Sequence, residues 1–289
     1  MPMTCPDPRI AVVIATRNRA AILRETLQRL LFLPERPQVI VVDNGSSDDT
    51  VEVARSAGSS VKLIALPGNH GAAARNLGVE AASTPYIAFA DDDSWYEPCS
   101  LSLAVDLFDH HPRLGLIAAR VLVGPAAELD PTCAAMARSP LPRARDLPGP
   151  TVLGFLACGA IVRRSAFLAV GGFSDRLGVG GEEKLLAIDL AVAGWQLAYI
   201  DSVVTRHHPP MRVDHQARRR TLVRNALWSA WLRRRPAGAI AETARLVRRH
   251  LFNRAGRAAI REAIAGLRSI VDARRPVPRD LDRLLYLID

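Results

Sequence analysis

The sequence has no apolar run long enough to cross a membrane. A membrane-spanning helix needs about 18–20 consecutive apolar residues, whereas the longest runs here, 114–119 and 155–162, have the length of a strand. The N-terminal stretch MPMTCPDPR has neither a basic region nor an apolar core, so we expect no secretory signal. We therefore do not expect an integral membrane protein.

Cysteine is also scarce. The four cysteines are Cys5, Cys99, Cys133 and Cys158. They form no CxxC pair, which excludes the usual zinc and redox motifs. Cysteines scattered in this way are expected to be free thiols in a reducing cytoplasm, rather than the framework of a secreted domain.

Lysine is nearly absent, because 36 of the 38 basic residues are arginine. The net charge of +9 is uneven: from Arg206 onward twenty arginines face seven acidic residues, a net charge of +13, while residues 1–205 carry −4. Such a basic segment attracts polyanions. Its arginines are spread through helical patterns, so we favour a solvated helix surface, then attraction to acidic lipid headgroups, with nucleic acid last.

The remaining composition is that of a globular protein, with 49% hydrophobic residues among 289. Short β-branched runs such as IAVVIA at 10–15 are typical of strands buried on both faces. The predicted strands are 10–15, 39–42, 61–66 and 86–90, and the predicted helices are 20–31, a segment ending near Ala57, 72–82 and 97–109. This alternation predicts an α/β fold with a mostly parallel sheet flanked by helices.

The pattern changes after residue 123. Residues 124–150 contain six prolines and are expected to form a long loop or an insertion. Extended chain is predicted at 152–162, a helix from about 182 to 193 ended by Gly194, and strands at 197–200 and 203–204. From Pro210 onward the pattern is helical, with apolar anchors at Trp228, Trp231, Leu232, Leu246, Val247 and Leu251.

Polar residues gather where the first four predicted strands end. The groups that follow these strands are Thr16-Arg17-Asn18-Arg19, residues 43–47, residues 67–71 and Asp91-Asp92-Asp93. Ligands of open parallel sheets bind beyond the carboxyl ends of the strands, so the four groups predict the rim of an active site.

The three aspartates are the most specific feature of this rim. Adjacent carboxylates repel one another unless a cation offsets their charge. In an extended segment Asp91 and Asp93 would point the same way and could face one ion, and oxygen ligands favour Mg²⁺ or Mn²⁺. The alternative is a solvated acidic turn that caps the following helix.

Two further rim residues suit a nucleotide. Arg75 lies about one turn into a predicted helix in GAAARNLG (71–78), where a guanidinium can bind phosphate through two hydrogen bonds. The carboxylate of Asp43 can accept hydrogen bonds from a nucleobase or a ribose hydroxyl. Each residue has a structural alternative, which is a surface arginine on a packed helix for Arg75 and a cap of the turn over 44–49 for Asp43.

The motifs VVIATRNR, VVDNGSSDDT, GNHGAAARNLGV and AFADDD occur in this order, and GGF and GGEEKLLAIDLAVAGW follow. With them the sequence resembles the family 2 nucleotide-sugar glycosyltransferases of GT-A fold over residues 9–208. The resemblance implies a Rossmann-like GT-A domain over residues 1–208 and leaves residues 209–289 as a basic helical C-terminal segment.

The resemblance also implies roles for single residues. Thr16 and Asp43 match positions that hold the nucleobase, and Arg75 matches an arginine near the base and the diphosphate, with Arg19 as a further cation. The aspartates Asp91, Asp92 and Asp93 match positions that bind the ribose and a divalent metal, Mg²⁺ or Mn²⁺, with Asp93 and Asp91 as the expected metal ligands.

An acidic pair and a histidine pair near the end of the matching region fit the family pattern less closely. Glu182-Glu183 stands where the family usually has Glu-Asp, and Lys184 follows where an apolar residue is common. We expect Glu183 to be the catalytic base, although the pair could merely stabilise a helix N-terminus. His207 or His208 matches a histidine before the C-terminal region that could contact the metal or the diphosphate, and a surface histidine pair is the alternative.

The implied reaction is direct displacement at the anomeric carbon with inversion of configuration. Glu183 removes the proton of an acceptor hydroxyl, while the metal and Arg75 offset the charge of the departing nucleoside diphosphate. The donor would be a UDP, dTDP or GDP sugar. The choice of acceptor is expected to lie with residues 124–150 and with the segment after His208.

Two other classes of protein share some of these features. A nucleotidyltransferase should carry a GxGxR-type loop after the first strand, and residues 16–19 contain no glycine. A catalytically weak or inactive GT-A-like protein could dock on a membrane or a polyanion through its basic tail, but it would not need three adjacent aspartates.

The tail also suggests a membrane contact. Trp228 and Trp231 lie among arginines, a combination that suits an interfacial helix on acidic lipid and hence a lipid-linked acceptor. The alternative is that both tryptophans pack on the protein. The expected location is the cytoplasm, with peripheral contact at the inner face of the membrane.

Overall fold

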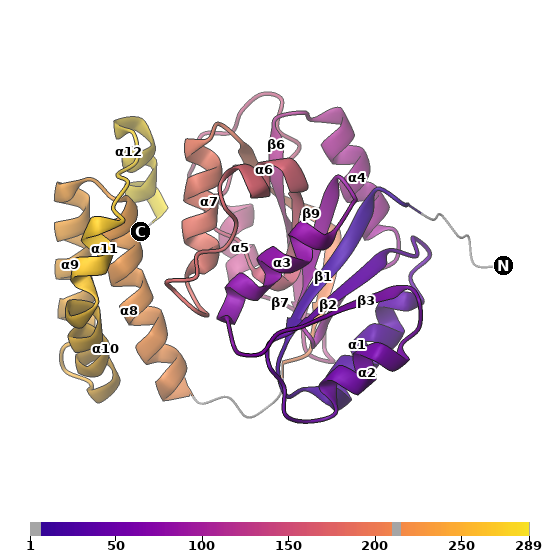
Figure 1. The fold of residues 1–289 in the computed structure, drawn as a ribbon. Helices are drawn as coiled ribbons and strands as arrows, with labels where there is room; N and C mark the ends of the chain where they lie inside the picture. Colours follow the sequence, from indigo (N-terminus) through magenta and orange to yellow (C-terminus); the bar gives the residue numbers. More distant parts are fainter. Residues whose placement is uncertain (1–6, 210–214, 289) are drawn as a thin grey trace.

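The computed structural model describes residues 7–209 and 215–288, which form a central sheet, helices on both of its faces and a helical C-terminal part (Figure 1). Cys5 and the first residues of the predicted C-terminal helical region, 210–214, lie outside the described residues. The described strands form one nine-stranded sheet in the order β3-β2-β1-β4-β8-β6-β9-β5, with β7 paired to β6.

The first half of the sheet is parallel, as predicted. It consists of β1 (Ile10–Thr16), β2 (Gln38–Asp43), β3 (Val61–Ala65) and β4 (Tyr86–Ala90). The helices between these strands are α1 (Ala20–Leu31), α2 (Thr50–Ser56) and α3 (Ala74–Ala81), with a short 3-10 turn, η1 (Gly71–Ala73), before α3. Both α1 and β4 have the predicted bounds, because their apolar periodicity is uninterrupted.

The second half of the sheet is mixed. Its elements are β5 (Ser94–Tyr96), α4 (Ser100–His110), β6 (Leu114–Val123), β8 (Ala160–Arg163) and β9 (Gln196–His207). β8 runs antiparallel to both β4 and β6, whereas β6 and β9 are parallel. The chain after β6 first passes Arg113 and Gln196, at the starts of β6 and β9. It then returns to Val121 at Gly159, and β8 runs back along β6 from there.

Several predicted elements have different bounds in the structure. Residues 124–150 contain β7 (Glu128–Leu129) and α5 (Pro131–Ala137), and are therefore not a simple loop. The segment predicted as extended, 152–162, is a strand only in β8, which follows the 3-10 turn η2 (Ala157–Gly159), and α6 (Arg164–Ala169) was not predicted. The predicted helix 97–109 begins at Ser100 because β5 precedes it, and 197–200 and 203–204 belong to the single bulged strand β9.

The prolines of residues 124–150 explain the first of these differences. Pro131 is the first residue of α5, and the side chain of Asp130 caps the helix by accepting a hydrogen bond from the Thr132 N–H (2.7 Å). Proline favours the first turn of a helix, where its missing N–H has no partner to lose. One of the six prolines, Pro131, therefore marks a helix start and not a loop.

Alternate residues of β1 pack on the two faces of the sheet. Ile10, Val12 and Ile14 belong to the hydrophobic core formed with α1 and α4, while Ala11 and Val13 face α3 and α7 (Glu182–Val192). A Cβ at Gly78 of α3 would lie 2.4 Å from the Val13 side chain. The small residues of GAAARNLG thus bring α3 close to the sheet, which places Arg75 at the sheet edge.

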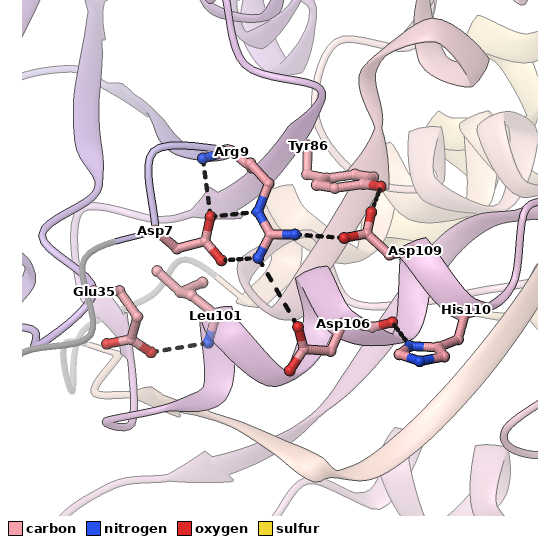
Figure 2. A network of polar contacts seen from close by, with 8 residues as sticks. All are labelled: Asp7, Arg9, Glu35, Tyr86, Leu101, Asp106, Asp109 and His110. Atoms are coloured by element: carbon pink, nitrogen blue, oxygen red, sulfur yellow. Dashed lines mark hydrogen bonds and ion pairs between the residues drawn. The ribbon is translucent and has the colours of Figure 1, made fainter.

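An ion-pair network fixes the start of β1 against α4 (Figure 2). The Arg9 guanidinium donates to Asp7 and to Oδ2 of Asp109 (2.5 Å), and Asp106 lies 3.9 Å away. The Tyr86 hydroxyl donates to the other oxygen of Asp109. The network lies at the amino end of β1 and β4, so it supports the scaffold and not the polar rim.

The C-terminal part consists of α8 (His215–Arg233), α9 (Pro236–His250), α10 (Arg254–Ala265), α11 (Leu267–Asp272) and α12 (Arg279–Ile288). It packs beside α7 (Figure 1) through two shared apolar clusters. Arg233 of α8 also forms an ion pair with Asp189 of α7 (2.5 Å). Among the described residues, no helix has both the length and the apolar character needed to cross a membrane.

Candidate active site

A cavity of about 710 Å³ opens at the carboxyl edge of the sheet. Thr16 and Arg19 line it after β1, Asn44 after β2, and Asp91, Asp92 and Asp93 after β4. Its other walls are Arg75, Glu182, Glu183, His207 and the first turns of α8. The structure thus brings the predicted rim residues together, with the exception of Asp43.

The three aspartates form a turn, so the expectation of an extended segment is wrong. The backbone oxygen of Asp91 accepts a hydrogen bond from the Ser94 N–H (3.1 Å), and the Asp91 N–H donates to Ser94 Oγ (2.7 Å). As a result the three carboxylates point to different partners. Asp91 pairs with Arg75, Asp92 accepts from Thr16 Oγ1 (2.8 Å), and Oδ1 of Asp93 lies 3.3 Å from Nε2 of His207.

The charges of this cluster are strongly coupled. Burial, together with the neighbouring Asp93, raises the pKa of Asp92 to about 6, although the Thr16 hydrogen bond lowers it. Burial lowers the pKa of His207, but the Asp93 carboxylate outweighs it and raises the pKa above its usual value. The three carboxylates of the turn thus lie close to Arg75, Arg19 and His207.

Arg75 of α3 is the buried cation of the cavity. Its guanidinium pairs with Asp91, and the side chain is only 10% exposed. Burial lowers the pKa of Arg75, but the negative charges of Asp91 and Glu182 outweigh burial and raise the pKa above its usual value. Arg75 therefore stays charged. Its Nε is buried and donates to no acceptor in the described part of the chain.

Glu182 and Glu183 begin α7 on the opposite wall. Glu182 is buried, and burial with the adjacent Glu183 charge raises its pKa to about 7. Glu183 is half-buried at the cavity, and desolvation raises its pKa as well. A carboxylate whose pKa lies near neutrality can accept and release a proton at working pH.

The loop before this pair is held by α8. Asn225, which is fully buried, donates through Nδ2 to the backbone oxygens of Leu177 (2.8 Å) and Gly180 (2.5 Å). Gly180 and Gly181 have φ of +96° and +91°, a conformation that side chains disfavour. Asn225 therefore fixes the turn that aims Glu182 and Glu183. No local sequence pattern could have predicted this long-range contact.

Asp43 and Arg19 have more modest surroundings. Asp43 is buried at the end of β2, and its carboxylate accepts hydrogen bonds from the N–H (3.0 Å) and the hydroxyl of Ser46. It therefore caps the turn after β2, which was the structural alternative, and Asn44 lines the cavity beside it. Arg19 is half-buried and lies close enough to lower the pKa of Asp92.

The donor set for a cation contains one residue that the sequence did not suggest. Side-chain ligand atoms of Asp91, Cys158 and His207 lie within 4.8 Å of one another. Burial raises the pKa of the Cys158 thiol well above its usual value, so the thiol stays protonated and is a poor ligand for a hard cation. A single cysteine without a spacing motif gives no sequence signal. His208 instead contacts the Trp95 ring (4.7 Å between centroids).

Comparisons with known proteins identify the family. The family described as glycosyl transferase family 2 matches residues 11–171. A pre-mycofactocin glycosyltransferase of Mycobacterium tuberculosis is 32% identical over 71% of this chain and 44% of its own length. An N-acetylglucosaminyl-diphospho-decaprenol L-rhamnosyltransferase of the same organism is 28% identical over 69% of this chain and 76% of its own length. The chain thus spans less than half of the first relative.

Solved structures agree on the fold. TarS 1-349 of S. aureus in complex with UDP-GlcNAc superposes with a TM-score of 0.62 at 16% identity, over 96% of this chain and 83% of that one. The mannosyltransferase PcManGT of Pyrobaculum calidifontis, in complex with GDP-Man and Mn²⁺, superposes with a TM-score of 0.61 at 18% identity. The match covers 99% of this chain and 87% of that one.

Fold and site together define a glycosyltransferase of GT-A architecture. The chain belongs to glycosyltransferase family 2. The predictions of an enzyme, of its family and of its fold class are thereby confirmed, and a nucleotidyltransferase is set aside.

Proposed function

We propose that this glycosyltransferase moves a sugar from a nucleoside-diphosphate sugar to an acceptor hydroxyl, with inversion and with the help of Mg²⁺ or Mn²⁺. The observation that carries the proposal is the cavity in which Asp91–Asp93 and Arg75 face the start of α7. Structural neighbours crystallised with UDP-GlcNAc, or with GDP-Man and Mn²⁺, support a donor of this class.

The donor nucleotide would lie along the β1 and β4 side of the cavity. Thr16, Arg19 and Asp92 border that side, and Asp43 holds the turn that carries Asn44 into it. Arg75 is placed for the diphosphate because it is a buried, charged guanidinium with an unpaired Nε. Arginine binds phosphate oxygens in this manner. UDP, dTDP and GDP sugars all remain within the proposal.

The residues present fit a divalent cation. Oδ1 of Asp93 is buried and accepts no hydrogen bond of regular geometry from the described residues. It lies 3.3 Å from Nε2 of His207, and ligand atoms of His207 and Asp91 lie within 4.8 Å of each other. We assign Asp93, Asp91 and His207 as the ligands of Mg²⁺ or Mn²⁺, which favour oxygen and imidazole donors. When bound, the ion would offset negative charge on the leaving nucleoside diphosphate.

Glu183 is the proposed catalytic base. It borders the cavity and is less buried than Glu182, so an acceptor hydroxyl can reach it. Its carboxylate takes the hydroxyl proton as the oxygen attacks the anomeric carbon from the face opposite the diphosphate, which inverts the configuration. Glu182 is buried in the cavity wall and is assigned no role in the reaction.

The acceptor side of the cavity is formed by α8. Arg218, Thr221, Leu222 and Arg224 line it, whereas no residue of 124–150 does, so the expected role of 124–150 in acceptor choice is not supported. The relative that is named for a diphospho-decaprenol acceptor supports a lipid-linked acceptor here. We accordingly propose an enzyme of the cytoplasm that works at the inner face of the membrane.

A thermal-shift panel tests the donor and metal assignments. The melting temperature is measured with UDP, dTDP, GDP and CDP, each with Mn²⁺ and with EDTA. We expect one nucleotide to raise it only with Mn²⁺, and Asp93→Ala to remove that rise. Asp146→Ala, at an exposed carboxylate paired with Arg113 outside the cavity, is the matched control. A rise that persists in EDTA would contradict the metal assignment.

A further inference from the structure

The two tryptophans of α8 are not exposed to a membrane. Trp228 Nε1 donates to the Ala263 oxygen of α10 (3.1 Å), and Trp231 Nε1 donates to Thr243 Oγ1 of α9 (3.0 Å). Both rings pack in an apolar cluster with Leu177 and Leu185. The expectation that they form an interfacial helix surface is therefore wrong, and the packed alternative holds.

A different surface of the C-terminal part is apolar and exposed. Its large side chains are Ile240, Leu251 and Phe252, which are 59%, 43% and 87% exposed. Ala237, Ala241 and Ala244 of α9 are exposed as well. At about 100° per residue these positions share one side of α9 and its C-terminal extension. We call this surface, residues 237–252 on the outer side of α9, the α9 face.

Positive charge lies within the α9 face and at its C-terminal end. Arg248 lies within it, and Arg249, Arg254 and Arg257 are exposed at its C-terminal end. None of the four forms an ion pair with a carboxylate among residues 7–209 and 215–288. The described C-terminal residues, 215–288, hold eighteen arginines against five acidic residues. An exposed apolar stripe bordered by unpaired arginines matches the interface of an anionic lipid surface.

The α9 face ends near the entrance of the cavity. α8 and α9 are antiparallel neighbours, so the turn after α9, with Leu251 and Phe252, lies at the same end as the first turns of α8 (Figure 1). The charge of Arg219 in those turns reaches His250 and lowers its pKa after the larger effect of burial. The adjacent residues Arg218 and Thr221 line the cavity.

We propose that the α9 face docks on anionic membrane lipid and so presents the α8 wall of the cavity to a lipid-linked acceptor. The apolar side chains distinguish this partner from nucleic acid, because a duplex backbone offers charge but no apolar layer for Ile240 and Phe252. The role in acceptor delivery rests on the proposed function, whereas the docking itself does not.

Vesicle co-sedimentation of the full chain tests the docking. The vesicles contain phosphatidylglycerol and phosphatidylcholine in equal parts, or phosphatidylcholine alone, at low and high salt. We expect binding to the anionic vesicles only, weakened by salt. The double variant Ile240→Asp/Phe252→Asp should lower the affinity at least about tenfold, since one buried large apolar side chain contributes that much. Phe32→Asp is the matched control, at an 88% exposed phenylalanine after α1.

A second variant tests the electrostatic part. Arg248→Gln/Arg249→Gln/Arg254→Gln should remove most of the salt dependence and keep the far-ultraviolet circular dichroism of the parent chain. Absence of binding to anionic vesicles, equal loss in Phe32→Asp, or full binding by the double variant would each overturn the proposal. So would a wild-type dimer that the double variant dissociates, because the α9 face would then be a contact between copies.

The test separates docking from chemistry. Vesicle binding requires neither donor nor acceptor, and release of nucleoside diphosphate with a water-soluble acceptor requires no membrane. The double variant Ile240→Asp/Phe252→Asp and the control Phe32→Asp should keep the wild-type rate in the soluble assay, because these side chains lie outside the cavity. A chain that docks but transfers nothing would contradict the proposed function and leave the docking surface in place.

Discussion

At the residue scale, Glu182 and Glu183 are adjacent but occupy different environments. Both line the cavity, but Glu182 is buried, whereas Glu183 is half-buried. We expect Glu183→Gln to lower kcat by about 10²- to 10⁴-fold, the usual contribution of a general base. The nucleotide-dependent thermal shift should persist. The rate of sugar transfer is measured as the release of nucleoside diphosphate. Normal turnover by Glu183→Gln would show that another group is the base.

The raised pKa of Glu183 also predicts the pH dependence of transfer. The base must be deprotonated, and burial raises the pKa of its carboxyl group above the ordinary range of glutamate. We therefore expect kcat to fall with decreasing pH, and to begin falling at a higher pH than an exposed glutamate would cause. A pH–rate profile measured at saturating donor checks this, and a decline no earlier than that of an ordinary exposed glutamate would contradict it.

Glu182 should affect stability in the opposite direction to a paired carboxylate. Its pKa is about 7 in the folded protein and 4.5 ordinarily, so between these values the folded chain binds more protons than the unfolded chain. The free energy of unfolding therefore falls as pH rises through this window. We expect Glu182→Gln to be more stable than wild type at pH 8, by about 1–3 kcal/mol, and less different at pH 4.

Urea unfolding in EDTA at the two pH values checks this prediction. Glu80→Gln is the control because Glu80 is exposed on α3, and it should leave stability unchanged at both. An equal or lower stability of Glu182→Gln at pH 8 would mean that its attraction to Arg75 outweighs desolvation.

At the element scale, α8 acts as a brace for the start of α7. Asn225→Ala would remove the side-chain donor of the Gly180 backbone oxygen and leave that of Leu177 with Arg224 Nη2 (3.1 Å), at a cost of about 1–3 kcal/mol in stability. Misplacement of Glu183 by about 1 Å would lower kcat roughly 100-fold. The KM for the donor should change little, because the donor side of the cavity lies on β1 and β4.

Asn253→Ala is the matched control for this brace. Asn253 caps α10 by accepting a hydrogen bond from the Gly256 N–H (2.6 Å), in the same C-terminal part but without contact to the loop. It should lower stability and leave kcat intact. Steady-state kinetics compare kcat of Asn225→Ala with that of Asn253→Ala. Equal losses of kcat in the two variants would show that Asn225 contributes only to stability and does not position Glu183.

At the scale of the whole molecule, the C-terminal part shares its core with the sheet domain. Leu177 and Leu185 pack with Leu232 and Ile270, and Ile188 packs with Val277 and Leu285. The predicted division into residues 1–208 and 209–289 stays a proposal about function. We expect one cooperative transition for the full chain by scanning calorimetry, because these clusters couple the two parts.

A chain that ends at His208 should be poorly soluble. It would expose Leu177, Leu185 and Ile188, and each large apolar side chain contributes about 1.5–3 kcal/mol when buried, against a total stability of about 5–15 kcal/mol. The soluble fraction after expression and the calorimetric trace check this. Two separate transitions in the full chain, or a soluble shortened chain that binds nucleotide normally, would instead make residues 1–208 an independent domain.

The sequence by itself determined the elements of the first half of the sheet and which rim residues meet there. β-Branched runs and helical periodicity are local properties, so they predicted β1 to β4 and α1 to α3, and hence the parallel half of the sheet. The carboxyl ends of parallel strands meet at one edge, so Thr16, Arg75 and Asp91–Asp93 could be placed together before any coordinates.

Only the tertiary structure decided the contacts between distant segments. The turn at Asp91–Ser94, the approach of Cys158 and His207 to Asp91, and the brace from Asn225 to the loop before Glu182 each depend on long-range packing. The same holds for Trp228, which packs inward, and for Phe252, which does not. Helical periodicity shows that a side chain lies on an apolar face, but which helix covers that face depends on how the whole chain packs.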